Sequence, residues 1–290
     1  MTAQHEHSAA PRIAIIGGTG LYSLPGAEVL GTPEVATPFG APSGPITIAR
    51  VAGRPVVFLS RHGRAHSTAP QQINYRANLW ALKSLGVEAV VSSAAVGSLS
   101  PRHGTGTFAV PDQFIDRTWG RADTYFDGSL AAGVQHLPAA EPFCPALRSA
   151  LAGALAARGE SFDPSGTVAV INGPRFSTKA ESAWLLAAGA GLVSMTQYPE
   201  PVLAAELNMG FATLAYITDA DTGHDGSEPV TAELVLGRLA AAQPRILAVL
   251  EALVSTLDGG YRARALMPAA AVQTVLAAAV QPAAQPAGGR

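Results

Sequence analysis

The chain has 290 residues, enough for one large domain or two modest ones. Hydrophobic residues make up 48% of it and charged residues 14%, which predicts a buried globular core and argues against disorder over most of its length. The net charge of −2 gives no reason to expect a nucleic acid or a membrane as a partner. The single cysteine, Cys144, excludes an intrachain disulfide framework, and the opening "MTAQHEHSAAPR" lacks the apolar core of a secretory signal. We therefore expect a soluble, cytoplasmic protein.

Short runs rich in valine and isoleucine alternate with longer helical patterns along the chain. The predicted strands cover residues 13–17, 46–51, 56–60, 89–93, 107–111, 167–171, 192–195 and 211–217. The predicted helices lie near residues 73–85, 145–158, 179–188, 201–208 and 231–257, and Pro244 should kink or split the last of them. This alternation predicts one α/β domain in which helices flank a largely buried sheet. In such folds ligands collect at the carboxyl ends of strands, so the loops that follow the strands are the candidate sites.

The first of these loops is Gly17-Gly18-Thr19-Gly20, directly after the first predicted strand. It does not match the G-x-G-x-x-G pattern of dinucleotide-binding loops, because Ser23 stands where the third glycine would be. No Gly-Lys-Ser/Thr follows it, which excludes a P-loop. Its backbone N–H groups and the Thr19 hydroxyl could hold one small anion. A strand-ending turn without a ligand fits the same residues equally well.

Two more loops could approach the same anion. In "SRHGRAH", residues 60–66, Arg61 can offer a planar fork of donors to a phosphate and His62 a further donor, although a solvated basic loop is the alternative. In "SSAAVGSLS", residues 92–100, small side chains let the backbone approach a ligand or simply pack beneath helices. The scattered histidines and one cysteine do not supply a zinc-binding set, so we expect no metal.

Three later loops carry groups suited to an aromatic ligand. Phe176, in "INGPRFSTKAES", could stack on a planar ring, and Met195, in "SMTQYPE", could lie against a sugar, although both residue types are more often core. Thr196 supplies a hydroxyl like that of Thr19. Asp219 and Asp221, in "ITDADTGHDG", could cap a helix or form an Asx-turn. In a water-poor pocket such a carboxyl would instead have a raised pKa and could donate a proton to a departing base.

Taken in order, these segments resemble the trimeric purine nucleoside phosphorylase superfamily, and most closely its 5′-methylthioadenosine phosphorylase branch. The matching segments are "IIGGTGLY", "TPFG", "SRHGRAH", "NYRANLWALKSLG", "DQFIDRT", "HLPAAEPFCP", "INGPRFSTKAES", "SMTQYPE" and "TDAD". The resemblance implies a single α/β domain with a central mixed sheet over residues 12–257, assembled as a homotrimer. Residues 1–11 are then a flexible N-terminus, and residues 258–290 an alanine- and proline-rich extension, frayed over about its last 20 residues.

The resemblance also assigns roles, with inorganic phosphate as co-substrate and no metal or other cofactor. The phosphate-binding residues would be Thr19, Arg61, His62, Ala94, Ala95 and Thr196. The nucleoside-binding residues would be Phe176, Ser177, Met195, Asp219, Asp221, Ala232, Val235 and Leu236, with His136 reaching the site of a neighbouring subunit. Asp219 would be the catalytic acid that protonates the base at N7.

The implied reaction is phosphorolysis of S-methyl-5′-thioadenosine. An aspartate at 219 suits a 6-amino purine, whereas relatives that prefer 6-oxopurines generally have asparagine there. Ala94 replaces a threonine that family members often carry, and Gln197 and Tyr198 replace smaller residues. The alternatives are a phosphorylase of methylthioinosine, inosine or purine nucleosides in general, a nucleosidase that uses water, and a nucleoside-binding protein without activity.

Overall fold

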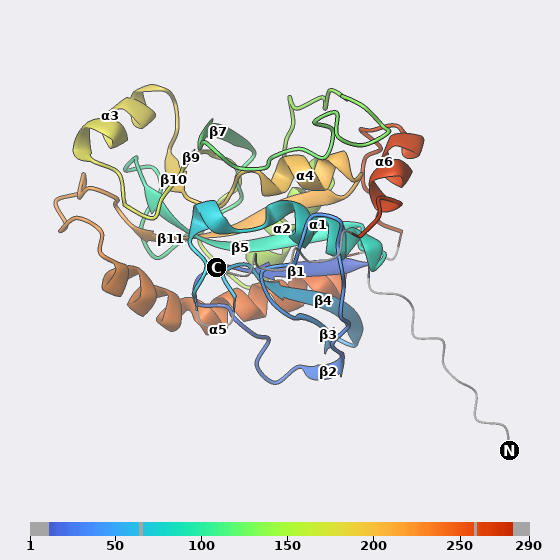
Figure 1. Ribbon diagram of the computed structural model, residues 1–290. Helices are drawn as coiled ribbons and strands as arrows, with labels where there is room; N and C mark the ends of the chain where they lie inside the picture. The colour runs from blue at the N-terminus through green and yellow to red at the C-terminus, as the bar shows by residue number, and fades with distance from the viewer. Residues whose placement is uncertain (1–11, 64–65, 258–259, 281–290) are drawn as a thin grey trace, which may run out of the picture.

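The computed structural model describes residues 12–63, 66–257 and 260–280, and it confirms a single α/β domain with a mixed central sheet (Figure 1). The main path of the sheet runs β2 (Glu28–Gly31), β3 (Ile46–Val51), β4 (Arg54–Ser60), β1 (Ile13–Gly17), β5 (Ala89–Ser98), β10 (Leu192–Ser194), β9 (Thr167–Ile171) and β7 (Gln113–Arg117). Off this path, β11 (Gly210–Asp219) pairs with β5, β6 (Phe108–Ala109) pairs with β11, and β8 (Phe162–Asp163) pairs with β6.

The sheet divides around β5, and this division creates the space for a site. The strand β11 runs parallel to one edge of β5 along nearly its whole length. On the other edge, β1 pairs in parallel with β5 up to Ser92, and β10 pairs antiparallel with it at Gly97 and Ser98. The carboxyl ends of β1 and β10 therefore face each other across residues 93–96 of β5.

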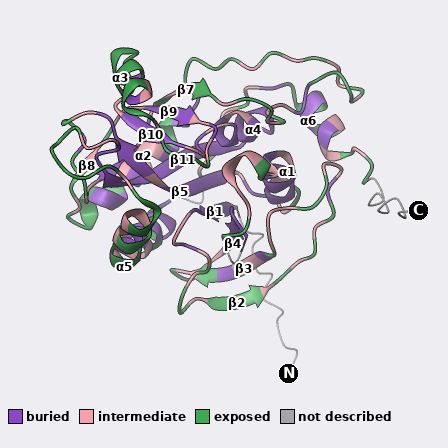
Figure 2. Cartoon of the chain, turned by 60° about the vertical axis from the view of Figure 1, so that its left-hand side comes forward, coloured by how far each residue is buried: buried purple, intermediate pink, exposed green. Residues whose placement is uncertain are grey.

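Helices pack on both faces of the sheet and enclose two large apolar cores. One core joins α1 (Tyr75–Ser84), α4 (Glu200–Glu206) and α6 (Ala269–Leu276), and the other joins α2 (Pro145–Ala157) and α5 (Ala232–Thr256). The alternation along β1 explains this arrangement, because Ala14 and Ile16 enter the first core while Ile13 and Ile15 enter the second. Figure 2 shows the resulting pattern, with β1 and β5 buried between the helices and the edge strand β2 exposed.

Several predicted elements need correction. The strand β5 extends to Ser98, so most of "SSAAVGSLS" is strand and not loop, because β11 supplies pairing partners throughout. Pro244 lies inside α5, which is one helix and is not split. We did not predict β2, β7, β8 or the one-turn helix η1 (Pro70–Gln72).

The C-terminal extension contains another correction. We expected residues 271–276 to be frayed, but they belong to α6, whose Val272 and Val275 are buried, and Trp80 Nε1 donates to the carbonyl of Val275. The boundary at residue 257 stays a prediction, and the predicted flexible segment 1–11 and the end of the tail, 281–290, lie outside the described residues.

By length and composition, α5 alone among the described helices could cross a membrane. Its apolar face carries Leu239, Ile246 and Leu253 into the second core, which is the ordinary position of a long core helix.

Candidate active site

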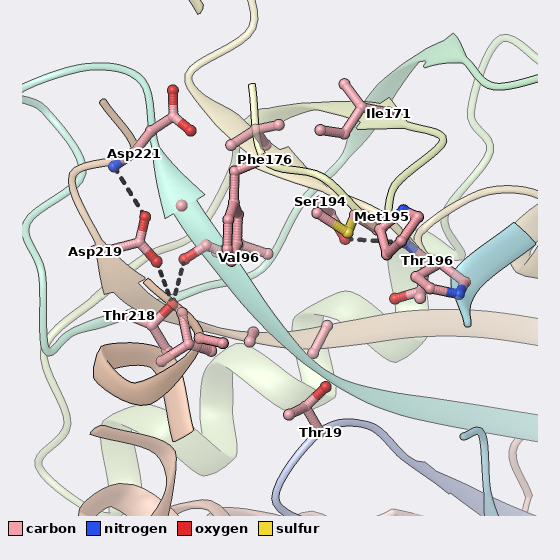
Figure 3. Close-up of a pocket in the computed structure, with 18 of the residues that line it drawn as sticks. Thr19, Val96, Ile171, Phe176, Ser194, Met195, Thr196, Thr218, Asp219 and Asp221 are labelled. Atoms are coloured by element: carbon pink, nitrogen blue, oxygen red, sulfur yellow. Dashed lines mark hydrogen bonds between the residues drawn. The ribbon is translucent and has the colours of Figure 1, made fainter. Parts of the chain in front are cut away.

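A cavity of about 290 Å³ occupies the gap between the ends of β1 and β10. Of the predicted site residues, all but His136 line it: Thr19, Arg61, His62, Ala94, Ala95, Phe176, Ser177, Met195, Thr196, Asp219, Asp221, Ala232, Val235 and Leu236. Figure 3 shows the two aspartates on one side of the cavity and Met195 with Thr196 on the other. Residues brought from seven separate segments of the chain therefore share one cavity.

His136 is the exception. It lies exposed in the loop between β7 and α2 and does not line the cavity of its own chain. Its assignment to the site of a neighbouring subunit stays a prediction.

The guanidinium of Arg61 is buried and already paired. Its Nε and Nη2 donate to Glu200 Oε1 and Oε2 at 2.6 and 2.9 Å, and both side chains are at most 1% exposed. Nη1 donates to the carbonyl of Ser93 at 3.1 Å, and Nη2 also donates to the Ser92 hydroxyl. We expected a free planar fork, but of the five guanidinium N–H groups only one, on Nη1, is left for a ligand.

The glycines of the first loop make this position of Arg61 possible. A Cβ on Gly18 would lie 2.8 Å from Arg61 Nη1 and 2.3 Å from the Ser93 carbonyl oxygen. A Cβ on Gly17 would lie 2.0 Å from the carbonyl oxygen of Leu21. These two glycines are therefore required by packing against the arginine and within the turn, whatever the loop binds.

His62 lies beside Arg61 with one ring nitrogen occupied. Its Nδ1 is 2.9 Å from the carbonyl oxygen of Thr68, which can only accept, so Nδ1 carries the proton. Burial, followed by the positive charge of Arg61, lowers the pKa of His62 to about 4. Near pH 7 the ring is neutral, and its Nε2 can accept a hydrogen bond but not donate one. The expectation that His62 is a simple donor therefore needs correction.

A second histidine lies beside His62. The ring of His66 lies with its centroid 4.6 Å away, and Nδ1 of His66 is 3.2 Å from the Tyr22 hydroxyl. Burial lowers the pKa of His66 as well. Arg64, from the same motif, lies outside the described residues.

The two aspartates stand where β11 ends, and both are buried. Asp219 Oδ1 accepts from the backbone N–H of Asp221 at 2.9 Å, and its Oδ2 accepts from the Thr218 hydroxyl at 2.6 Å. The first contact is an Asx-turn, which confirms one of the two interpretations of Asp219, and the residue also lines the cavity. Burial raises the pKa of Asp219, and burial together with the nearby Asp219 charge raises that of Asp221.

Hydrogen bonds at the start of α3 (Lys179–Ala187) hold the loop that carries Phe176. Thr178 and Glu181 form a capping box at the start of α3, and Glu181 also pairs with Arg175, which fixes both ends of the loop that carries Phe176. Phe176 is 38% exposed at the mouth of the cavity. Next to it, the Ser177 hydroxyl is buried in the wall and has no hydrogen-bond partner among the described residues.

At the remaining corner, Thr231 caps α5 and its hydroxyl accepts from the N–H of Leu234. The first turn of that helix then presents Ala232, Val235 and Leu236 to the cavity.

Sequence reasoning missed Glu200, which pairs with the arginine, and much of the cavity wall. The additional lining residues are His66, Pro70, Val96, Gly97, Ile171, Pro174, Val193, Ser194 and Thr218. Glu200 had no distinguishing local signal, because an acidic residue at the start of a helix is ordinarily solvent-exposed. Within the described ranges, no group of three histidine, cysteine, aspartate or glutamate side chains could hold a metal ion.

Comparisons with known proteins show which family the chain belongs to. The family model for the phosphorylase superfamily matches residues 12–255. The chain is 45% identical over 252 residues to the purine nucleoside phosphorylase of Streptomyces coelicolor. The match covers 84% of this chain and 89% of the relative. It is 49% identical over 211 residues to the S-methyl-5′-thioadenosine phosphorylase of Mycolicibacterium smegmatis. That match covers 73% of this chain and 78% of the relative.

Among solved structures, the methylthioadenosine phosphorylase of Schistosoma mansoni in complex with adenine matches with a TM-score of 0.81. The identity is 34%, and the match covers 85% of this chain and 92% of that one. All of the residues that line the cavity fall within the range matched by the family model.

Proposed function

Because this chain belongs to the phosphorylase superfamily, we propose that it cleaves the N-glycosidic bond of S-methyl-5′-thioadenosine with inorganic phosphate. The products are adenine and 5-methylthioribose 1-phosphate, so the enzyme is a pentosyltransferase of purine and methionine salvage. The observation that carries this proposal is one cavity with a buried acid, Asp219, on one side and the hydroxyl of Thr196 on the other.

Phosphate would bind where β1, β4 and β5 converge. Thr19 and Thr196 offer hydroxyl donors, Ala95 and Ala94 offer small side chains beside the backbone, and Arg61 keeps one N–H directed by its ion pair with Glu200. A phosphate oxygen placed below C1′ stabilises the positive charge that develops on the ribose as the bond to the base breaks. It then forms the new bond to C1′ as the nucleophile.

The leaving base needs a proton, and Asp219 can supply it. Its raised pKa keeps a larger share of the carboxyl protonated than an exposed aspartate would have. The proton would pass to N7, and an oxygen of Asp219 or Asp221 would accept from the 6-amino group. The unpartnered Ser177 hydroxyl provides a further polar contact, and Phe176 an aromatic face for the purine.

The 5′ end of the substrate would lie against Ala232, Val235 and Leu236, with Met195 along the ribose. These apolar side chains favour a methylthio group over a hydroxyl, with an advantage of about 1–3 kcal/mol. Leu236 is 47% exposed and Phe176 38%, so the mouth is open in a single chain. This exposure supports a homotrimer in which His136 of one subunit covers the site of the next.

The cellular setting follows from the chemistry. The proposed reaction needs phosphate and a nucleoside, both cytoplasmic metabolites, and we propose a cytoplasmic enzyme that works without a metal or organic cofactor.

The test is the initial rate of base release from methylthioadenosine, methylthioinosine, adenosine and inosine, each with and without phosphate. We expect methylthioadenosine to react fastest and only with phosphate. Faster reaction of the inosine forms would contradict the role given to Asp219, and a rate independent of phosphate would identify a nucleosidase. Binding without turnover would show that the chain is no enzyme.

A further inference from the structure

Arg121 lies behind one wall of the cavity without lining it. It follows β7, and its guanidinium reaches the backbone that leaves two other strands. Nη2 donates to the carbonyls of Asn172 at 3.2 Å and Met195 at 2.9 Å, the first residues after β9 and β10. Nη1 donates to the carbonyl of Tyr198 and, at 3.3 Å, to the Tyr75 hydroxyl. One side chain thus joins three loop positions and a helix.

The two loops that Arg121 joins carry the nucleoside-facing residues. The loop after β9 leads through Gly173 to Phe176 and Ser177, and the loop after β10 begins with Met195 itself. The loops touch each other tightly, because a Cβ on Gly173 would lie 2.6 Å from Met195 Sδ. A small shift of either loop would therefore change the space between Met195 and Phe176.

Arg121 is not arranged to touch a ligand. Its four Nη hydrogens are all engaged by the contacts above, and its buried Nε has no hydrogen-bond partner among the described residues. The guanidinium also stacks over the ring of Tyr75, 5.4 Å from its centroid. Unlike Arg61, it forms no ion pair within 4.0 Å among the described side chains, and its hydrogen-bond acceptors are neutral oxygens.

We propose that Arg121 is a positioning residue for the nucleoside: by bonding the carbonyls of Asn172 and Met195, it sets the separation of the two loops that hold the base and the ribose. This inference rests on the proposed function. It predicts that loss of Arg121 impairs use of the nucleoside more than phosphate binding, because Thr196 is the one proposed phosphate-binding residue that lies in these loops, whereas Thr19, Arg61, His62, Ala94 and Ala95 lie elsewhere.

The test compares Arg121→Met and Arg121→Lys with wild type in phosphate-dependent release of adenine from methylthioadenosine. We expect Arg121→Met to lower kcat/KM for the nucleoside by about 10- to 100-fold, with the phosphate KM within about threefold of wild type. A lysine provides a compact ammonium that cannot span four acceptors, so Arg121→Lys should restore only part of the loss. It also serves as the variant to measure if Arg121→Met does not fold.

The matched control is Arg148, which donates to the backbone carbonyls of Pro111, Val110 and Pro164 but lies outside the cavity wall. Arg148→Met should lower the melting temperature and leave both KM values unchanged. If it reproduces the Arg121 effect, or if the nucleoside and phosphate constants change together in both Arg121 variants, the inference is wrong. If wild type releases no adenine with phosphate, the proposed function fails first, and that result is distinct from the split in constants.

Discussion

The two halves of the cavity are built in opposite ways. The half formed by Thr19, Arg61 and His62, which we call the phosphate half after its proposed ligand, is polar. Arg61 is 1% and His62 4% exposed, and Thr19 is half-buried. The half formed by Phe176, Val235 and Leu236 with the two aspartates, the nucleoside half, is apolar at its mouth and open to solvent there. In the proposed function, polar groups are thus fixed by hydrogen bonds where the charge of phosphate would lie, and the apolar wall is left accessible.

The two halves also differ in which contacts hold their side chains in place. Arg61 is fixed by a buried carboxylate and two further acceptors before any phosphate arrives, so binding requires little rearrangement there. The nucleoside half depends on loops joined through Arg121 and on surfaces that a ligand would bury. Variants in the two halves should therefore fail in different measurements.

The largest effect is expected at Asp219, the buried acid of the nucleoside half. Asp219→Asn should lower kcat for methylthioadenosine by about 10²- to 10⁴-fold, because the proton donor to N7 is lost. An asparagine amide can instead donate to a 6-oxo group, so the ratio of methylthioinosine to methylthioadenosine turnover should rise. The measurement is kcat for both nucleosides in both proteins.

The pH profile provides the control for that variant. In wild type, kcat should fall as pH rises through the pKa of Asp219, which burial places above its usual value, because only the protonated form donates. Asp219→Asn should lack this limb. An unchanged profile in the variant would show that another group delivers the proton.

The next effect concerns the ion pair under the phosphate half. Glu200→Gln would leave Arg61 as an unpaired buried cation and should reduce the free energy of unfolding by about 3–5 kcal/mol. The double variant Arg61→Met, Glu200→Met should recover much of that stability, because it removes both buried charges. It should nevertheless bind phosphate poorly.

Chemical denaturation and phosphate titration separate these two results. A single variant that loses less than about 1 kcal/mol would show that the pair is not needed to offset burial. A double variant with normal phosphate affinity would show that Arg61 takes no part in phosphate binding.

The sequence predicts some parts of this molecule well, because their pattern is local. The bounds of β1, β3 and β9 agree with the apolar runs, since each strand is bounded by turn residues or polar residues. The loops after the strands converge because carboxyl ends of strands meet in an α/β sheet. Placing Asp219 and Thr19 in one cavity therefore needs only the order of strands and loops.

Other features depend on contacts between distant segments and have no local signal. Arg61 and Glu200 are 139 positions apart, so nothing near "SRHGRAH" reveals that its fork is already occupied. The small residues after Ser92 are typical of a loop, yet pairing with β11 makes them strand. The helix α6 is alanine-rich and follows Pro268, and only its packing against Trp80 and the first core distinguishes it from a tail.

The smallest expected effect concerns the protonation state of His62 when phosphate binds. With the pKa of His62 at about 4, its ring is neutral at pH 7 and presents the acceptor Nε2 to the cavity side opposite Thr68. A bound phosphate must then either donate a P–OH proton to Nε2 or raise the pKa of His62 enough to protonate it. The first case takes up no proton, because the dianion HPO4²⁻ already carries a P–OH, whereas the second takes up one. We expect the second, because a dianion beside the ring favours its charged form.

Phosphate should therefore bind more tightly as pH falls from 8.5 to 6, with a change of up to about tenfold per pH unit on the alkaline side. His62→Asn supplies an amide N–H that donates without titrating, so it should bind the dianion with a flatter dependence. The measurement is the phosphate dissociation constant by calorimetry in buffers of different ionisation enthalpy, which also counts the protons taken up. Equal slopes for wild type and His62→Asn, with no proton uptake at pH 8, would show that His62 stays neutral in the complex and that phosphate binding does not protonate it.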